Sequence, residues 1–121
     1  MKWELRDDRA IYVQLIEHIK LCVVSGIYPP GSKVPSVREL ANEAAVNPNT
    51  MQRALADLER DGLLFTQRTA GRFITEDANM IEKAKKDLAI EEIRSFLSAM
   101  RQIGYTKDDI FKVINQLEGE Q

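Results

Sequence analysis

Four side chains that can hydrogen-bond to DNA stand close together in the middle of the chain: Asn47, Asn49, Gln52 and Arg53. Asn and Gln can each pair with adenine through two hydrogen bonds, and Arg can pair with guanine in the same way. Residues 47–56 contain no carboxylate that would repel a nucleic acid. These residue types in this spacing predict a surface that reads double-stranded DNA.

A helix beginning after Asn47 would present these side chains together. Asn47 is a favoured N-cap residue, and Pro48 suits the first helical position because its missing N–H is not needed there. Apolar residues recur at helical spacing and should face inward: Met51, Leu55 and Leu58. The outward face should then carry Asn49, Arg53, Ala56 and Arg60, with Gln52 at its edge.

A second, shorter helix is predicted just before this one. Ser36 can cap it, and Glu39 three residues later completes a capping box. Its apolar stripe comprises Val37, Leu40, Ala41 and Ala44. A turn at Ala45–Val46 joins the two helices, which favours a helix-turn-helix, the alternative being an ordinary helical hairpin with a solvated polar face.

Two short β-prone runs follow the stop signal at Asp61-Gly62. Residues 64–68 and 72–75 flank a turn that contains Gly71, which predicts a hairpin. A helix-turn-helix followed directly by a hairpin is a winged helix. Arg68 and Arg72 flank the tip of this wing, where they can meet phosphates or the minor groove, or serve only solubility.

Helices are also predicted on both sides of this unit. The first covers about residues 10–25, with Cys22 among its buried residues and His18 on its solvated side. After the wing, Asp77 caps a long helix to about Ile103, and Thr106 with Asp109 starts a last one. The apolar stripes of these two helices need the winged domain or a second subunit to cover them. Candidate dimerisation residues are Ile93, Phe96, Met100, Ile103, Ile110, Ile114 and Leu117.

Composition limits the other functions that the chain could have. The net charge is −2, and residues 33–75 carry a net charge of only +1, so affinity for DNA must come from where the charges lie. One His and one Cys offer no metal set, triad or disulfide, so we expect neither an enzyme nor a cofactor. No apolar run suggests a signal peptide or a membrane span, which favours the cytoplasm.

The run from Ala10 to Thr75 resembles the winged-helix domain of the GntR family of bacterial transcription regulators. The matching stretches are IYVQLIEHI, the approach from Gly26 to Ser36, VRELA, VNPNTMQRALADLERDGLL and the AGRFIT wing. The NPNT motif and the short two-helix tail resemble the YtrA-type subfamily, whose small C-terminal helical pair serves dimerisation. The resemblance covers essentially the whole chain.

This resemblance implies a mainly α fold with a small β-hairpin: a winged helix-turn-helix over residues 1–76 and a helical dimerisation tail over residues 77–121. It implies a homodimer that binds an inverted-repeat operator, usually as a repressor, and regulation of transport genes. Arg38 and Thr50 match DNA-contacting positions of the family, whereas Pro48 and Gln52 stand where many members carry arginine. The candidate DNA-binding residues are Lys33, Ser36, Arg38, Asn47, Asn49, Thr50, Gln52, Arg53, Arg68 and Arg72.

Two other classes of function stay open at this point. A winged helix that contacts only proteins would suit the near-zero charge, although the lack of acids over residues 47–56 argues against it. A sensor of a small-molecule effector is compatible with DNA binding, but no residue in the sequence indicates where the effector would bind.

Overall fold

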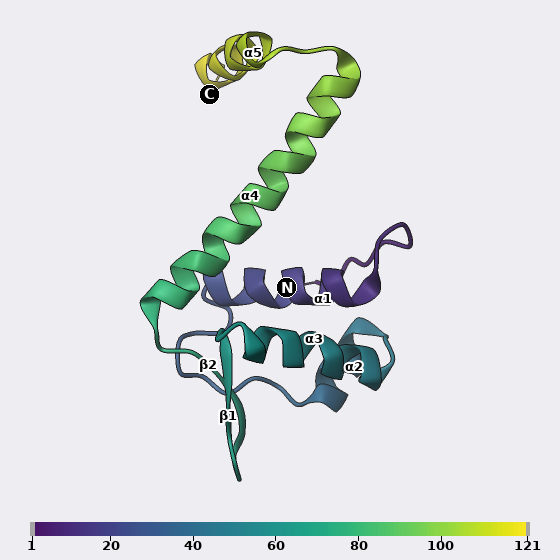
Figure 1. Ribbon diagram of the computed structural model, residues 1–121, viewed down its shortest axis with the longest axis vertical. Helices are drawn as coiled ribbons and strands as arrows, with labels where there is room; N and C mark the ends of the chain where they lie inside the picture. Colours follow the sequence, from purple (N-terminus) through teal and green to yellow (C-terminus); the bar gives the residue numbers. More distant parts are fainter. Residues whose placement is uncertain (1, 121) are drawn as a thin grey trace. The chain divides into compact units, whose positions relative to one another are not determined.

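The computed structural model describes residues 2–120, and Figure 1 shows its helices and its hairpin. The elements are, in chain order, α1 (Ile11–Val24), α2 (Val37–Ala44), α3 (Pro48–Arg60), β1 (Leu64–Gln67), β2 (Gly71–Ile74), α4 (Ala78–Ile103) and α5 (Lys107–Gly119). This order confirms the mainly helical fold with one hairpin. The chain forms two compact units, one ending at Leu88 and the other beginning at Ala89.

The core of the first unit lies where α1, α2 and α3 meet. Leu15 and Ile19 of α1 and Leu55 of α3 are completely buried, and the burial of Leu55 was predicted from its helical spacing. The same cluster includes Leu40, Met51, Leu58, Leu64, Ile74 and, from the first turns of α4, Ala84. Because each buried aliphatic side chain contributes about 1.5–3 kcal/mol, this cluster holds α3 rigidly in place.

The wing, residues 64–74, is a two-stranded antiparallel hairpin. Leu64 pairs with Ile74, and both side chains are buried against the helices. Phe65 pairs with Phe73 on the other face, where their rings stack with centroids 5.8 Å apart. β1 is one residue shorter than expected, so Arg68 lies in the turn, and β2 begins and ends one residue earlier than expected, so Gly71 belongs to the strand.

The approach to α2 also joins the wing, which the sequence did not predict. The Val34 N–H donates to the Arg72 carbonyl oxygen, and the Ile74 N–H donates to the Ser32 carbonyl oxygen, each at 2.9 Å. Pro29, Pro30 and Pro35 flank this stretch. Because prolines argue against a strand, the sequence does not indicate that the stretch pairs with the wing. These bonds tie the wing to the start of α2.

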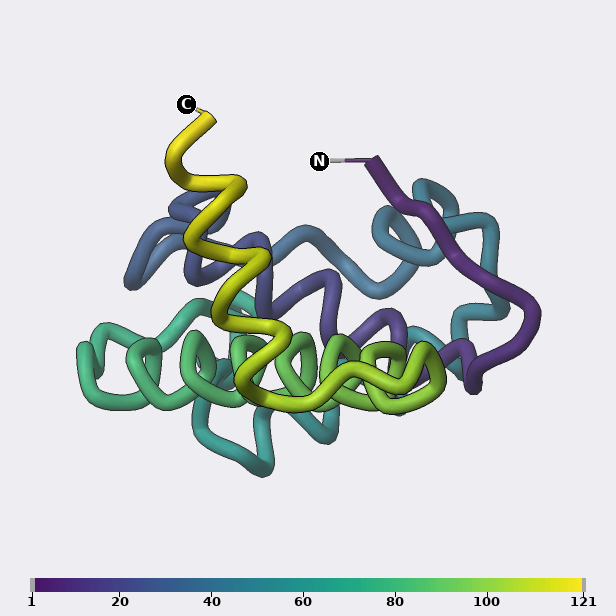
Figure 2. Tube along the Cα trace, turned by 90° about the horizontal axis from the view of Figure 1, so that it is seen from above, coloured from purple at the N-terminus to yellow at the C-terminus, as the bar shows by residue number. Residues whose placement is uncertain are grey.

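A non-helical arm, residues 2–10, precedes α1 and is drawn in purple in Figure 2. The buried Gln14 side chain donates to the Arg6 carbonyl oxygen at 2.8 Å and accepts from the Arg6 N–H at 2.7 Å. The Trp3 ring stacks on His18, with centroids 3.7 Å apart. The prediction that His18 is a solvated surface residue was wrong, because an aromatic ring far away in the chain covers it.

Cys22 is buried on the inner face of α1, as predicted. Burial raises the pKa of its thiol, because a thiolate would lose its hydration there. The side chain therefore acts as a small apolar residue.

The second unit consists of the rest of α4 and of α5. Gly104 has a φ of 90°, a left-handed conformation that ends α4, as predicted. The predicted capping box is also confirmed: the Asp109 N–H donates to Thr106 Oγ1, and the Thr106 N–H donates to Asp109 Oδ2. These backbone and side-chain bonds lower the pKa of Asp109, because they favour its charged form.

Candidate nucleic-acid interface

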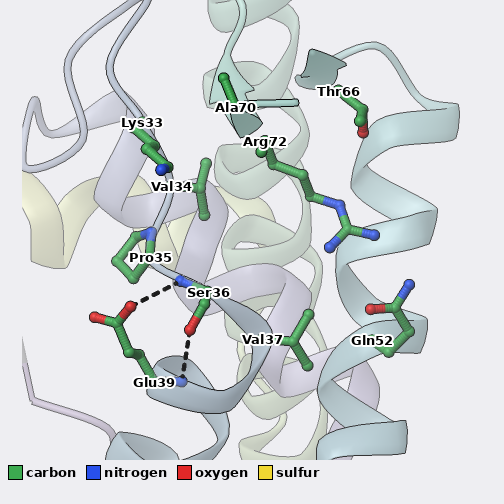
Figure 3. A pocket seen from close by; sticks show the side chains of 11 residues that line it. Lys33, Val34, Pro35, Ser36, Val37, Glu39, Gln52, Thr66, Ala70 and Arg72 are labelled. Carbon is green, nitrogen blue, oxygen red and sulfur yellow. Dashed lines mark hydrogen bonds between the residues drawn. The ribbon is translucent and has the colours of Figure 1, made fainter. Parts of the chain in front are cut away.

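The junction of α2 and α3 has the geometry that the two capping signals predicted. The Glu39 N–H donates to Ser36 Oγ at 3.1 Å, and the Glu39 carboxylate accepts from the Ser36 N–H (Figure 3). Ala45 then adopts a left-handed conformation with a φ of 56°, which turns the chain sharply between the helices. A non-glycine residue is strained in this region, so the flanking helices must hold the turn.

α3 begins as predicted, and its two faces divide as predicted. Asn47 Oδ1 accepts from the Asn49 N–H at 2.7 Å, so this amide oxygen serves the cap while its NH₂ group keeps its donors. Asn49, Gln52 and Arg53 are exposed, and Thr50 is half-buried. The helix therefore presents amides and a guanidinium away from the core.

A cleft of about 720 Å³ lies between the start of α2, α3 and the wing. Its lining includes four of the ten predicted DNA-binding residues: Lys33, Ser36, Gln52 and Arg72. Figure 3 shows the Arg72 side chain reaching from β2 toward Gln52 on α3. The cleft lining thus includes the guanidinium of Arg72, the ammonium group of Lys33 and the amide of Gln52.

Arg72 is more enclosed than its place near the wing tip suggested. Its side chain is 20% exposed, and its Nε is buried without a hydrogen-bond partner among the described residues. Glu59 Oε1 lies 3.9 Å from this Nε and also accepts the hydroxyl hydrogen of Thr66. A buried guanidinium nitrogen that lacks a hydrogen bond is costly, and the nearby carboxylate of Glu59 offsets part of this cost by its charge.

The other predicted DNA-binding residues lie outside the cleft lining. Arg38 is exposed in the first turn of α2, and Arg68 is exposed in the turn of the wing. Ser36 belongs to the lining, but its oxygen accepts from the Glu39 N–H in the helix cap, which leaves its hydroxyl hydrogen and one lone pair for a ligand.

Sequence reasoning missed Tyr12, Glu59 and Thr66. Arg53 Cζ lies 3.7 Å from the centroid of the Tyr12 ring, a contact between α1 and α3. Glu59 and Thr66 join α3 to β1. No local pattern marks these residues, because each contact joins two elements whose relative position depends on the packed core.

Residues 11–74 match the family described as bacterial regulatory proteins, gntR family. The chain belongs to the GntR family. This chain is also 32% identical to the HTH-type transcriptional repressor YtrA from Bacillus subtilis, over 95% of this chain and 89% of the relative. The resemblance stated from the sequence is confirmed.

Solved structures agree with this assignment. A GntR family transcriptional regulator from Listeria monocytogenes has a TM-score of 0.81 and 38% identity, covering 93% of this chain and 98% of that one. The DNA-binding domain of AraR in complex with its operator ORE1 has a TM-score of 0.52 and 27% identity, covering 62% of this chain and 94% of that one. This GntR-family chain is thus a winged-helix transcriptional regulator.

Two other possible features of the described part of the chain are a metal site and a membrane-spanning helix. Within residues 2–120, no three His, Cys, Asp or Glu side chains come together as metal ligands could. In the same stretch, no helix is both long and apolar enough to cross a membrane.

Proposed function

We propose that this regulator represses transcription in the cytoplasm by binding an inverted repeat in double-stranded DNA as a homodimer. One observation carries the proposal: the exposed amide of Gln52 on α3 borders the same cleft as Lys33 and Arg72. The cleft thus combines a group that can read a base with cations that can hold phosphates. AraR, whose DNA-binding domain has a similar fold, was solved on operator DNA.

The residues divide into two roles. Asn49, Gln52 and Arg53 lie on the exposed face of the first turns of α3, where a helix in the major groove contacts base edges. Other side chains hold the sugar-phosphate backbone through cations, a hydroxyl or an amide. These are Lys33, Ser36, Arg38, Asn47, Thr50, Arg68 and Arg72.

The second unit supplies the dimer interface in this proposal. Ile93, Ile103 and Leu117 are each more than half exposed, which is unusual for large aliphatic side chains. Phe96, Leu97, Tyr105, Phe111 and Ile114 are also exposed, whereas Ile110 is buried within the chain. An apolar surface of this extent is typical of a protein–protein interface. A second copy of the same surface would cover it with two-fold symmetry.

A dimer also explains how a chain of net charge −2 can bind DNA. Two copies bring two sets of cations to one duplex. A two-fold dimer would place its two α3 helices in half-sites about 34–36 Å apart, which is one helical turn. An inverted repeat is the sequence that matches this symmetry.

The rival function is a winged helix that contacts only other proteins, which the near-zero net charge would suit. Selection of binding sites from a pool of random duplex DNA separates the two functions. We expect the wild-type protein to select an inverted repeat and to bind it less tightly as salt rises, since phosphate contacts release counterions. A pool without any enriched repeat, and affinity that does not change with salt, would refute DNA readout.

A further inference from the structure

The Arg53 guanidinium packs over an aromatic ring from another helix. Its Cζ is 3.7 Å from the centroid of the Tyr12 ring, which is van der Waals contact. Tyr12 is the second residue of α1 and is half-buried, whereas Arg53 is exposed on the outer face of α3. Within residues 2–120, Arg53 forms no ion pair, so the ring is its main partner.

This contact leaves the hydrogen-bonding capacity of Arg53 intact. A guanidinium carries its five N–H donors in the plane of the group, whereas the ring occupies only its face. The in-plane edge can still pair with two acceptors at once. Guanine offers such a pair in O6 and N7, and a phosphate offers it in two oxygens.

The contact also restricts a side chain that would otherwise sample many rotamers. Ordering a flexible side chain at an interface costs about 0.5–1.5 kcal/mol. A side chain that is already held in the free protein has lost much of that freedom before the ligand arrives. The buried residues of α1, such as Leu15, keep the Tyr12 ring in position relative to α3.

We propose that Tyr12 is a positioning residue that holds the Arg53 guanidinium ready for a two-acceptor contact with DNA. The inference rests on the proposed function, because it assigns a role within the same DNA interface. Tyr12 reads no base by itself. It acts on affinity and base preference only through Arg53.

The first test uses the free protein, so its outcome does not depend on DNA binding. A side chain above an aromatic ring has its proton NMR signals shifted upfield. We expect this shift at the Arg53 side chain in the wild type and in Tyr12→Phe, which keeps the ring. The shift should disappear in Tyr12→Leu. An unshifted Arg53 signal in the wild-type protein would overturn the proposal.

The second test is a double-mutant cycle on the selected DNA repeat, with Tyr12→Leu, Arg53→Ala and the double variant. Tyr12→Leu should weaken binding about 2- to 10-fold for each half-site, the loss that matches the ordering cost. In the Arg53→Ala background, Tyr12→Leu should weaken binding no further. Tyr12→Phe should bind within about 2-fold of the wild type, since the face of the ring is kept.

Two results would refute the positioning role. Independent, multiplicative losses in the cycle would mean that Tyr12 acts without Arg53. An equal loss in Tyr12→Phe and Tyr12→Leu would assign the effect to the hydroxyl group as a direct DNA contact. Unfolding by urea should confirm that each variant is folded at the assay temperature. If the wild type selects no repeat while Arg53 shows its ring-induced shift, the proposed function fails and the packing of Arg53 on Tyr12 stands.

The same selection experiment distinguishes the two possible acceptors of Arg53. Loss of preference at one guanine position in each half-site, without a change in salt dependence, assigns the contact to a base. A uniform loss across sequences, with a smaller salt dependence, assigns it to a phosphate. Either result supports the positioning role if the cycle shows coupling.

Discussion

Glu59 of α3 lies against Arg72 of the wing, with Oε1 3.9 Å from the Arg72 Nε. The same carboxylate accepts the hydroxyl hydrogen of Thr66 on β1, so it joins the helix to both strands. It also places a negative charge beside Arg72, which lines the cleft that we expect to face phosphates. The contact therefore aligns the wing and opposes DNA binding at the same time.

Removing the negative charge of Glu59 while keeping the shape of the side chain should strengthen DNA binding. Glu59→Gln keeps an oxygen that can accept from Thr66 but no longer neutralises Arg72. We expect affinity for random duplex DNA at low salt to rise by about 2- to 5-fold, in keeping with the modest strength of ion pairs near a protein surface. Fluorescence anisotropy with a labelled duplex would measure this rise.

Glu82→Gln provides a matched control, because it removes the same charge from an exposed position on α4. A rise of equal size in this control would mean that total charge matters rather than the charge beside Arg72. Unchanged binding in Glu59→Gln would place Arg72 outside the DNA interface.

Arg38 and Arg72 should set the salt dependence of binding. If each touches a phosphate, the double variant Arg38→Ala, Arg72→Ala should reduce the slope of log K against log salt by about two per protomer. Affinity should fall for all sequences alike, because phosphates carry no sequence information. Binding isotherms at several salt concentrations would measure the slope, and an unchanged slope would favour the protein-contact function.

Asn49 and Gln52 should affect specificity more than affinity. Each good bidentate pair is worth about 1–3 kcal/mol of discrimination against a wrong base. We expect Asn49→Ala and Gln52→Ala to relax base preference at particular positions, symmetrically in both half-sites. Selection from random DNA with each variant checks this, and an undiminished preference for the same repeat would show that α3 is not the reader.

A substitution at Phe96 can test whether the second unit forms the dimer interface. Its side chain is 42% exposed within the chain and stands among the apolar residues of the second unit. Phe96→Glu would place a charge in the proposed interface, where burial without a partner is costly. Sedimentation should show a monomer for this variant and a dimer for the wild type. A variant that stays dimeric would rule out this face as the interface.

His18 should make the attachment of the N-terminal arm depend on pH. Burial lowers the pKa of His18, while the carboxylate of Glu43 opposes this shift. The unfolded chain therefore takes up the proton more readily than the folded chain. The contribution of this contact to stability should be complete above about pH 6.5 and should be lost as pH falls toward the lowered folded pKa.

Urea unfolding at pH 7.5 and pH 5.5 would measure this effect, with Trp3, the only tryptophan of the chain, as the fluorescent probe. His18→Phe keeps a ring against Trp3 and cannot take a proton, so its loss of stability between the two pH values should be smaller. An equal loss in both proteins would assign the pH dependence to other groups.

Local patterns determined most of the elements and the two faces of α3. The capping boxes at Ser36 and Thr106, the cap at Asn47 and the hairpin turn act over a few residues, so the sequence alone predicts them. The family followed from long ordered motifs. The burial of Met51, Leu55 and Leu58 followed from helical spacing.

Only the tertiary structure decided which side chains meet. The stack of Trp3 on His18, the ring of Tyr12 under Arg53 and the carboxylate of Glu59 beside Arg72 each join residues of different elements. Their relative positions depend on how the N-terminal arm packs on α1 and on how α1 and the wing pack on α3. Many buried side chains contribute to this packing at once. A sequence pattern reports the periodicity within one element, whereas these contacts depend on the distances and angles between elements.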